Sequence, residues 1–259
     1  MNRDEAVELL RRDPLRHIVT LKMLARYGEH MDLRCVSESG TWALMSLLPT
    51  ELSEYDSRAY ATTRLVVLID GNSATLKLRL FDDLPRTDMV VKTYDGAVKR
   101  HVTNQLAGEP TASFASFSAP SNLMLPACEA ILESSTLSEE AALIFGEAGY
   151  SHRELEKWFR DGSCWFGIRK SGTLVSACFL YRNFDSVWEI AGVFTDPKHR
   201  RQRFATTVVT AALKYLLELQ RLPRYQVPTT NTASMQLARS IGLQEFLRLD
   251  HFLVRRGAA

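Results

Sequence analysis

The chain has 259 residues, of which 46% are hydrophobic and 24% are charged, and its formal net charge is +2. This composition is typical of a globular protein with enough apolar side chains for one large domain or two medium ones. The small net charge excludes a protein that binds polyanions through its overall charge, so any anion is expected to bind locally.

The sequence predicts no targeting or membrane segment. Its first residues, MNRDEAVELLRRDP, are charged and lack the apolar core of a signal peptide, and no stretch approaches the roughly 18 apolar residues of a membrane span. Cys35, Cys128, Cys164 and Cys178 have no CxxC spacing. We therefore expect reduced thiols, no metal site, no membrane contact and a cytoplasmic location.

The N-terminal half alternates helix-like and strand-like segments. Helix-like runs occupy residues 4–11 and 14–27, and strand-like runs follow at LRCVSE, TWALMSLL, AYATT and RLVVLID. The helix-like NSATLKLRLFDDL, the strand MVVKTY and the helix GAVKRHVTNQL complete this half. These patterns predict an α/β domain.

The segment GEPTASFASFSAPSN, residues 108–122, is rich in Ser, Pro and Gly and has no periodicity. We interpret it as a connector with a short strand at residues 113–117. The predicted domains are therefore residues 1–118 and residues 119–259.

The C-terminal half begins with helix-like segments at residues 138–147 and 152–161. A hairpin signature, SCWFGIRK–SG–TLVSACFLYR, and a third strand, VWEIAGVFT, follow. Apolar residues then recur with helical spacing from 204 to 217. The strand PRYQVP, the helix ASMQLARSIG and the strand segment LQEFLRLDHFLV close the half. The order predicts an α+β fold in which helices cover both faces of a mixed sheet.

The basic turn KHRRQR, residues 198–203, lies between the third strand and the long helix. A helix N-terminus offers about four unpaired N–H groups and a partial positive charge, so arginines before it suit a phosphate or pyrophosphate. A solvated basic turn explains the same residues. A nucleic-acid surface is disfavoured, since no aromatic residue is interleaved and no second cluster is as dense.

The segment VFTDPKHRRQRFA resembles the pyrophosphate loop of the GNAT superfamily of acyl-CoA-dependent N-acyltransferases, with pattern Gln/Arg-x-x-Gly-x-Gly/Ala. Arg200 stands first and Ala205 last, and Arg203 replaces the usual Gly. If the loop requires a positive φ at this position, Arg is strained there.

A second segment, NTASMQLARSIGL, resembles the family pattern Asn-x-x-Ala-x-x-Leu-Tyr-x-x-x-Gly-Phe, with Asn231, Ser234, Leu237, Gly242 and Leu243 on its positions. PRYQV and TNTAS resemble the branch that contains glycine N-acyltransferase and its bacterial relatives. The N-terminal half has a similar element order but no basic loop. It is interpreted as a degenerate GNAT-like copy, with an unrelated α+β lid as the alternative.

The resemblance implies that acetyl-CoA is the co-substrate, that a small amine attacks its thioester directly, and that the protein is a monomer or a homodimer. It also implies that pantetheine pairs with the strand AGVFT, where Gly192 marks a bulge. The implied CoA-binding residues are Val193, Phe194, Thr195, Arg200, Arg201, Gln202, Arg203, Phe204, Ala205, Thr206, Asn231 and Ser234.

Glu189 is the candidate general base, because several family members carry a catalytic Glu eleven residues before the loop position held here by Arg200. Burial within an apolar run would raise the pKa of such a carboxyl. The same Glu at a strand end is explained equally by a structural ion pair. Ala238 stands at the family's Tyr position and cannot donate a proton, so Tyr225, Cys164 and His251 are the substitutes considered.

Two other functions fit the sequence. Arg203 and Ala238 favour a catalytically silent acyl-CoA-binding module, whereas Glu189 favours an enzyme. A peptide or protein N-acetyltransferase differs only in the acceptor groove.

Overall fold

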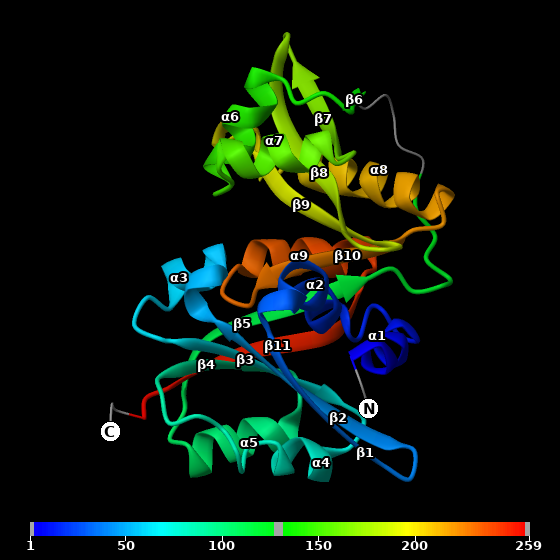
Figure 1. The fold of residues 1–259 in the computed structure, drawn as a ribbon. Coiled ribbons are helices and arrows are strands. Elements are labelled where there is room, and N and C mark those ends of the chain that lie inside the picture. Colours follow the sequence, from blue (N-terminus) through cyan, green and yellow to red (C-terminus); the bar gives the residue numbers. More distant parts are fainter. Residues whose placement is uncertain (1–2, 127–131, 257–259) are drawn as a thin grey trace. The chain divides into compact units, whose positions relative to one another are not determined.

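The computed structural model describes residues 3–126 and 132–256 (Figure 1). The chain forms two compact units, the first from residues 3–114 with 247–256 and the second from residues 115–246. Two strands, β5 (Glu109–Ser118) and β11 (Gln244–Val254), continue from one unit into the other.

The first unit has three antiparallel strands followed by a parallel pair. Its strands lie in the order β1-β2-β3-β4-β11-β5, in which β3 and β4 are parallel and β11 runs antiparallel to β4. Its elements in chain order include α1 (Arg3–Arg11), α2 (Ile18–Tyr27), β1 (Asp32–Glu38), β2 (Thr41–Pro49), α3 (Glu54–Ala59), β3 (Leu65–Gly71), α4 (Ala74–Arg79), β4 (Met89–Thr93) and α5 (Gly96–Gln105).

The second unit is arranged in a similar way, with strands in the order β5-β10-β9-β8-β7-β6. The pairs β6–β7, β7–β8 and β8–β9 are antiparallel, and β9 and β10 are parallel. Its elements include β6 (Leu132–Ser134), α6 (Glu139–Glu147), α7 (His152–Arg160), β7 (Cys164–Lys170), β8 (Thr173–Phe184), β9 (Val187–Thr195), α8 (Phe204–Glu218), β10 (Leu222–Pro228) and α9 (Thr232–Ile241).

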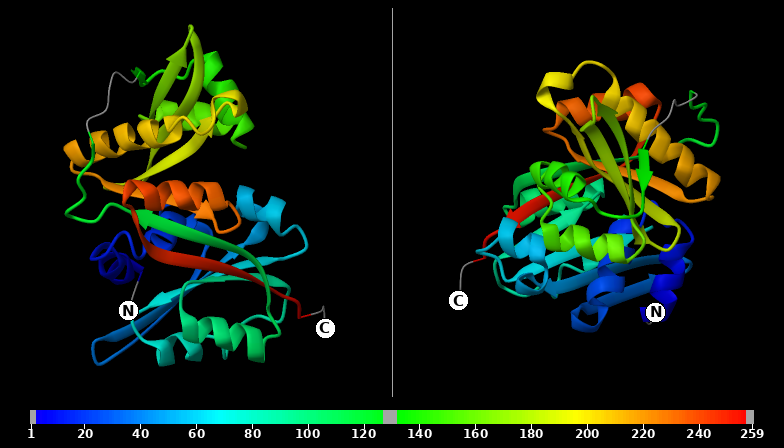
Figure 2. Two further views of the ribbon diagram at one scale, coloured as in Figure 1. Left: turned by 180° about the vertical axis from the view of Figure 1, so that it is seen from behind. Right: turned by 90° about the horizontal axis from the view of Figure 1, so that it is seen from above.

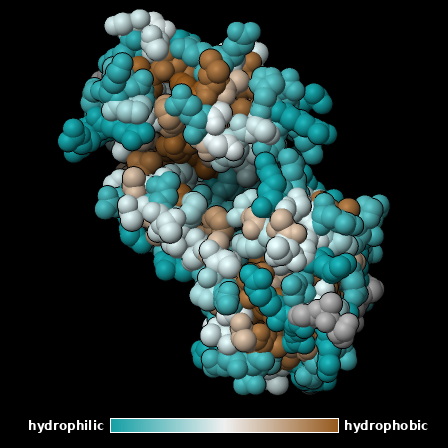
Figure 3. Space-filling model, turned by 90° about the vertical axis from the view of Figure 1, so that its left-hand side faces the viewer, coloured by the Kyte–Doolittle hydropathy of each residue, from teal (hydrophilic) through white to brown (hydrophobic). Residues whose placement is uncertain are grey.

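The predicted mixed fold and the element order of the C-terminal half are confirmed. Helices α8 and α9 pack through a core that includes Val208, Leu213 and Met235 on one face of the sheet, and α6 and α7 pack through Phe145 and Leu155 on the other (Figures 1 and 2). Polar side chains cover most of the surface seen in Figure 3, with hydrophobic ones visible between them.

Two local predictions were wrong. The segment AYATT, residues 59–63, is not a strand, because helix α3 runs into it. Ser53 caps the start of α3 by accepting a hydrogen bond from the Asp56 N–H, and at its end the Tyr60 N–H donates to the Asp56 carbonyl. The predicted connector is largely strand β5, which contains the short strand expected at residues 113–117 and extends it at both ends. Its serines hydrogen-bond to other strands. Ser113 donates to Asp250 of β11, and Ser118 donates to the Pro223 carbonyl of β10.

The last residues of the chain belong to the first unit and not to the predicted domain 119–259. Residues 247–256 lie in the first unit, where β11 pairs with β4 from Asp250↔Thr93 to Val254↔Met89. His251 accepts or donates a 2.6 Å hydrogen bond between its Nδ1 and the Tyr60 hydroxyl. Burial lowers the pKa of His251 to about 3, so this ring is neutral and structural.

Cys35, Cys164 and Cys178 are free thiols, and Cys128 lies outside the described residues. Across residues 3–126 and 132–256, no helix is long and apolar enough to cross a membrane. Within the same ranges, no three His, Cys, Asp or Glu side chains are grouped closely enough to hold a metal ion.

A buried polar cluster lies beyond the last β3–β4 pair, Leu68↔Lys92. Asp70 is fully buried and accepts hydrogen bonds from Thr20 Oγ1 at 2.7 Å and from the Tyr94 hydroxyl, with His17 Nδ1 at 2.8 Å. Burial raises the pKa of Asp70, but His17, Tyr94 and Thr20 together outweigh burial and hold the pKa below its ordinary value. The ionised carboxylate therefore organises this end of the first unit.

Replacing Asp70 with Asn should lower the free energy of unfolding by about 2–4 kcal/mol, because buried donors lose a charged acceptor. Since the folded pKa is lowered, the stabilisation by Asp70 is present above its unfolded pKa of about 3.9 and is lost as the pH falls through the folded value. Urea unfolding at about pH 6 and about pH 3 should therefore show a smaller acid loss in D70N than in the wild type. The exposed Asp82→Asn is the control, and an equal acid loss in D70N would contradict the assignment.

Candidate functional site

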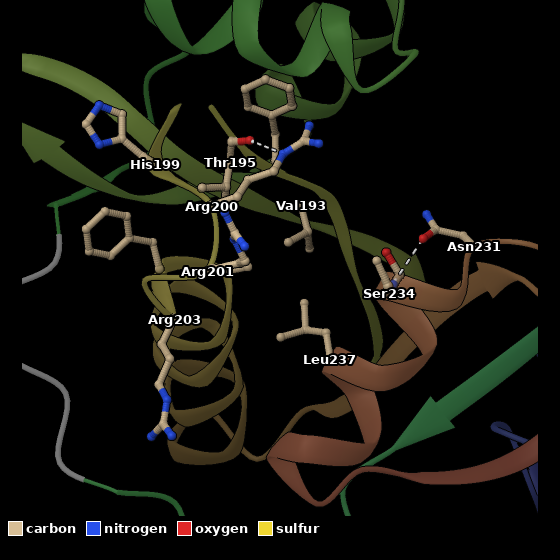
Figure 4. Close-up of a pocket in the computed structure, with 13 residues that line it drawn as sticks. Val193, Thr195, His199, Arg200, Arg201, Arg203, Asn231, Ser234 and Leu237 are labelled. Carbon is tan, nitrogen blue, oxygen red and sulfur yellow. Dashed lines mark hydrogen bonds between the residues drawn. The ribbon is translucent and has the colours of Figure 1, made fainter. Parts of the chain in front are cut away.

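A pocket of about 610 Å³ opens in the second unit between the end of β9, the start of α8 and the first turns of α9 (Figure 4). Val193 and Leu237 point toward each other from β9 and α9, and Arg200 and Asn231 lie on different sides of the cavity. Its lining residues are Val193, Phe194, Thr195, His199, Arg200, Arg201, Arg203, Phe204, Ala205, Asn231, Ala233, Ser234 and Leu237.

Gly192 bends β9 into the pocket. Its φ is +59°, and the β8–β9 register shifts between Ala177 and Phe179, which places an extra residue on β9. A Cβ at this position would lie 2.5 Å from the Phe179 ring, so only glycine fits. The predicted bulge is therefore present, and it redirects the strand just before its pocket-lining residues.

The parallel ladder between β9 and β10 is short. It contains the pairs Leu222↔Val187, Pro223↔Trp188 and Arg224↔Glu189, so Val193–Thr195 lie beyond its end. On its other side, β9 is fixed to β8, where the Ser176 hydroxyl donates to the Phe194 carbonyl at 2.9 Å. The edge of β9 at Val193–Thr195 therefore lies outside the β9–β10 ladder and lines the pocket, where an extended ligand could pair with it.

The basic loop leads directly into α8. Arg200 Nε donates to the Thr195 carbonyl at 3.2 Å, which ties the loop to the end of β9. Arg203 is the residue before α8, and its side chain makes no capping hydrogen bond. The first-turn N–H groups of α8 therefore remain available to an anion, beside three arginines that line the same pocket.

Arg201 and Arg203 have φ values of +63° and +62°, in the left-handed region. This confirms the strain predicted for Arg203 at the position where Gly is usual, whereas the strain at Arg201 had no counterpart in the motif. Side chains other than those of Gly, Asn and Asp adopt this conformation at a cost of about 1 kcal/mol or more. The loop therefore keeps two guanidinium groups at the expense of backbone strain.

The structure brings most of the predicted CoA-binding residues together. Gln202 and Thr206 belong to the same loop and helix start but do not line the pocket. Ala233 and Leu237 line it and lie on one face of α9 with Ser234, so helical spacing could have revealed them. His199 also lines it and belongs to the basic turn KHRRQR, so that pattern could have revealed it. Asn231 caps α9 by accepting from the Ser234 N–H at 3.0 Å.

The candidate proton donors are scattered. Ala238 is completely buried in the core beneath α9 and does not face the pocket. Cys164 is also a core residue, and His251 belongs to the first unit. Tyr225 is the exception: desolvation raises its pKa to about 12, although a hydrogen bond with the pocket residue Ser234 opposes this rise.

Glu189 is buried, with 4% of its surface exposed, but it is not among the pocket-lining residues. Its Oε2 accepts from Arg224 Nη1 and from Asn183 Nδ2, each at 2.7 Å, and its Oε1 accepts from the Gln226 N–H at 3.0 Å. The apolar surroundings expected from the sequence are thus replaced by polar partners. The general-base role stays a prediction.

Comparison with known proteins places this site in a family context. The sequence model of the Acetyltransferase (GNAT) family matches residues 131–243. This segment has the GNAT fold. No curated protein matches the sequence at a significant level.

Solved structures share the GNAT fold at low sequence identity. A GCN5-related N-acetyltransferase from Sphaerobacter thermophilus has a TM-score of 0.57 at 14% identity, covering 84% of this chain and 78% of its own. One from Kribbella flavida has a TM-score of 0.55 at 15% identity, covering 91% and 94%. A tandem GNAT protein from the clavulanic acid biosynthesis pathway has a TM-score of 0.54 at 12% identity, covering 93% and 88%.

Replacing Arg203 with Gly should have opposite effects on stability and on CoA binding. Glycine relieves the left-handed strain and should raise the free energy of unfolding by about 0.5–1 kcal/mol. Removal of a charge beside the uncapped helix should weaken CoA binding by about three-fold. Urea unfolding and titration calorimetry measure the two effects.

Gln220 provides the matched control, because its φ is +54° and it follows α8 at the end remote from the pocket. Gln220→Gly should stabilise the fold by a similar amount and leave CoA binding unchanged. Tighter CoA binding by R203G would show that strain, and not charge, dominates at this position.

Proposed function

We propose that the second unit is an acyl-CoA-dependent N-acyltransferase that moves an acetyl or short acyl group to a primary amine of a small molecule or amino acid. The observation that carries this proposal is the pocket, in which a free strand edge, an uncapped helix start and an arginine-rich loop meet. The family match of residues 131–243 supports it.

In this proposal, the pyrophosphate of CoA lies on the backbone amides of residues 201–206, with Arg200 and Arg201 neutralising its charge. Gln202 and Thr206 contribute only through their backbones, in agreement with side chains that do not line the pocket. Pantetheine pairs with the β9 edge at Val193–Thr195 and passes between β9 and α9, where Val193 and Leu237 approach each other.

The reaction is a direct attack of the neutral amine on the thioester carbon. The C–N bond forms, the C–S bond breaks, the sulfur leaves as a thiolate, and water or a base accepts the amine proton. In this proposal, a backbone N–H at the pocket end of β9 polarises the thioester oxygen. The pocket contributes mainly proximity and orientation of the two reactants.

The leaving thiolate needs little assistance, because its pKa is modest. Ser234 presents a hydroxyl to the pocket, and Tyr225 lies behind it in hydrogen-bonding contact. This pair is the available source of a proton, since Ala238 is buried and carries only a methyl group. The same buried Ala238 favours the second candidate function, a silent acyl-CoA-binding module.

For the first unit, we favour a degenerate GNAT-like copy. Its strands β1, β2, β3 and β4 repeat the antiparallel, antiparallel and parallel pairings of β7, β8, β9 and β10. A helix follows the third strand in both series, α4 after β3 and α8 after β9. The tandem GNAT structure that matches 93% of the chain supports this interpretation.

The first unit lacks the features that make the second a CoA site. Ser73 caps α4 by accepting from the Leu76 N–H, so the chain itself satisfies the start of this helix. Lys77 Nζ donates to the Gly71 carbonyl at 3.1 Å and pairs with Asp95. The lysine is therefore committed to its own unit and does not present its charge to a phosphate.

The acceptor is proposed from the sequence alone. The segments PRYQV and TNTAS resemble the glycine N-acyltransferase branch, which supports glycine and other amino acids as the first acceptors to test. A peptide N-terminus remains the alternative acceptor.

A thiol-release assay with acetyl-CoA and a panel of amines, amino acids and peptides tests the proposed activity. We expect release with a small amine or amino acid in the wild type. In Arg200→Ala/Arg201→Ala, the loss of two charges should weaken CoA binding, and the difference should grow at low salt. No release with any acceptor, together with intact CoA binding, would favour the silent module.

The whole chain should bind one CoA. Titration calorimetry of the wild type should give a single site, and the same double variant should remove or weaken that site. Because α4 is capped and Lys77 is paired, no second site is expected in the first unit. A stoichiometry of two would contradict the role given to that unit.

A further inference from the structure

Glu189 stands where the β9–β10 ladder ends. The pair Arg224↔Glu189 is the last in the parallel register, and both side chains are buried. A carboxylate and a guanidinium on adjacent strands at this point are held by a 2.7 Å ion pair. The next backbone donor of β10 is the Gln226 N–H. Its acceptor decides whether the two strands stay paired or separate.

The ladder begins with the Leu222 N–H donating to the Ser186 carbonyl at 2.9 Å. In a parallel ladder, every second residue repeats this pattern, so the Gln226 N–H would reach the Ile190 carbonyl. It instead donates to Glu189 Oε1 at 3.0 Å. The side chain of Glu189 thus takes the hydrogen bond that would otherwise join the next residues of the two strands.

Neighbouring residues fix the carboxylate in this position. Asn183 of β8 and Arg224 of β10 each donate to Oε2, and Arg224 Nη2 also donates to Ser116 Oγ of β5 at 3.1 Å. A buried carboxylate is costly unless it is paired and hydrogen-bonded, and Glu189 has both forms of compensation. It is therefore held directly from β8 and β10, and β5 supports it through Arg224.

We infer that Glu189 is a positioning residue that ends the β9–β10 ladder and keeps the β9 edge open for the pantetheine arm of the acyl-CoA. This inference rests on the proposed function, because it gives the open edge its ligand. Glu189 acts through the separation of the strands and does not itself touch the reacting atoms, which agrees with its absence from the pocket lining.

Glu189→Gln tests this role. Glutamine leaves the Arg224 charge buried without a carboxylate and turns an amide toward other donors, so the ladder end should lose its geometry. We expect CoA binding to weaken by about ten-fold or more, with a matching rise in the KM for acetyl-CoA. The loss of activity in Glu189→Gln should be the same at about pH 7 and about pH 9. If Glu189 were a general base, the loss of activity should instead be smaller at the higher pH, where free amine is abundant.

The double variant Glu189→Gln/Arg224→Gln tests whether a neutral hydrogen-bond network can replace the ion pair. In this variant, the side-chain oxygen of residue 189 can still accept from the Gln226 N–H. The side-chain NH2 of residue 189 can donate to the amide oxygen of residue 224 and to Asn183 Oδ1, which has no hydrogen-bond partner in the described structure. The neutral network should recover CoA binding to within about three-fold of the wild type. Turnover should recover with it, although the carboxylate is gone.

The outcomes separate the explanations. A double variant that binds CoA normally but turns over about 100-fold more slowly would overturn the inference and return Glu189 to the role of base. Normal CoA binding by Glu189→Gln itself would also overturn it. If Glu189→Gln does not fold, the double variant and the wild type alone give the answer. Failure of the wild type to bind CoA would instead reject the proposed function.

Discussion

The parallel ladder between β9 and β10 contains three residue pairs, and the pocket depends on where that ladder ends. Two local features enforce the separation. The bulge at Gly192 redirects β9, and no side chain fits there against Phe179. The Glu189 carboxylate takes the Gln226 N–H that would otherwise extend the pairing. An open strand edge is normally a liability, so its retention beside a cavity indicates a ligand that completes it.

The second constraint is the positive charge of the loop before α8, which is kept at a cost in folding stability. The loop before α8 holds Arg201 and Arg203 in left-handed conformations that glycine would adopt without strain, and it leaves the start of α8 without a side-chain cap. A fold selected only for stability would use Gly, Ser or Asp at such positions. Strain concentrated where three arginines line one pocket is typical of a binding site.

The two units show how the same strand and helix order serves different purposes. In the first, Ser73 caps the helix, and buried contacts among Asp70, His17 and Tyr94 fill the region beyond the parallel pair. In the second, the corresponding helix is uncapped and the region beyond the pair is a cavity. The difference lies in a few polar side chains, because the strand pairings are alike.

The sequence by itself determined the features that depend on local chemistry: the mixed fold, the buried face of α8, the bulge at Gly192 and the strained arginine before the helix. The fold and the buried face of α8 follow from periodicity. The bulge and the strained arginine follow from the resemblance of these segments to the GNAT motifs, in which Gly is usual at the loop position of Arg203. Only the tertiary structure decided the partners of Glu189, which are 6, 35 and 37 residues away. It also decided that the strand expected at residues 113–117 extends over 109–118 and that residues 250–254 pair with β4. These features depend on hydrogen bonds between segments far apart in the chain, and local patterns do not record which distant donor will meet which acceptor.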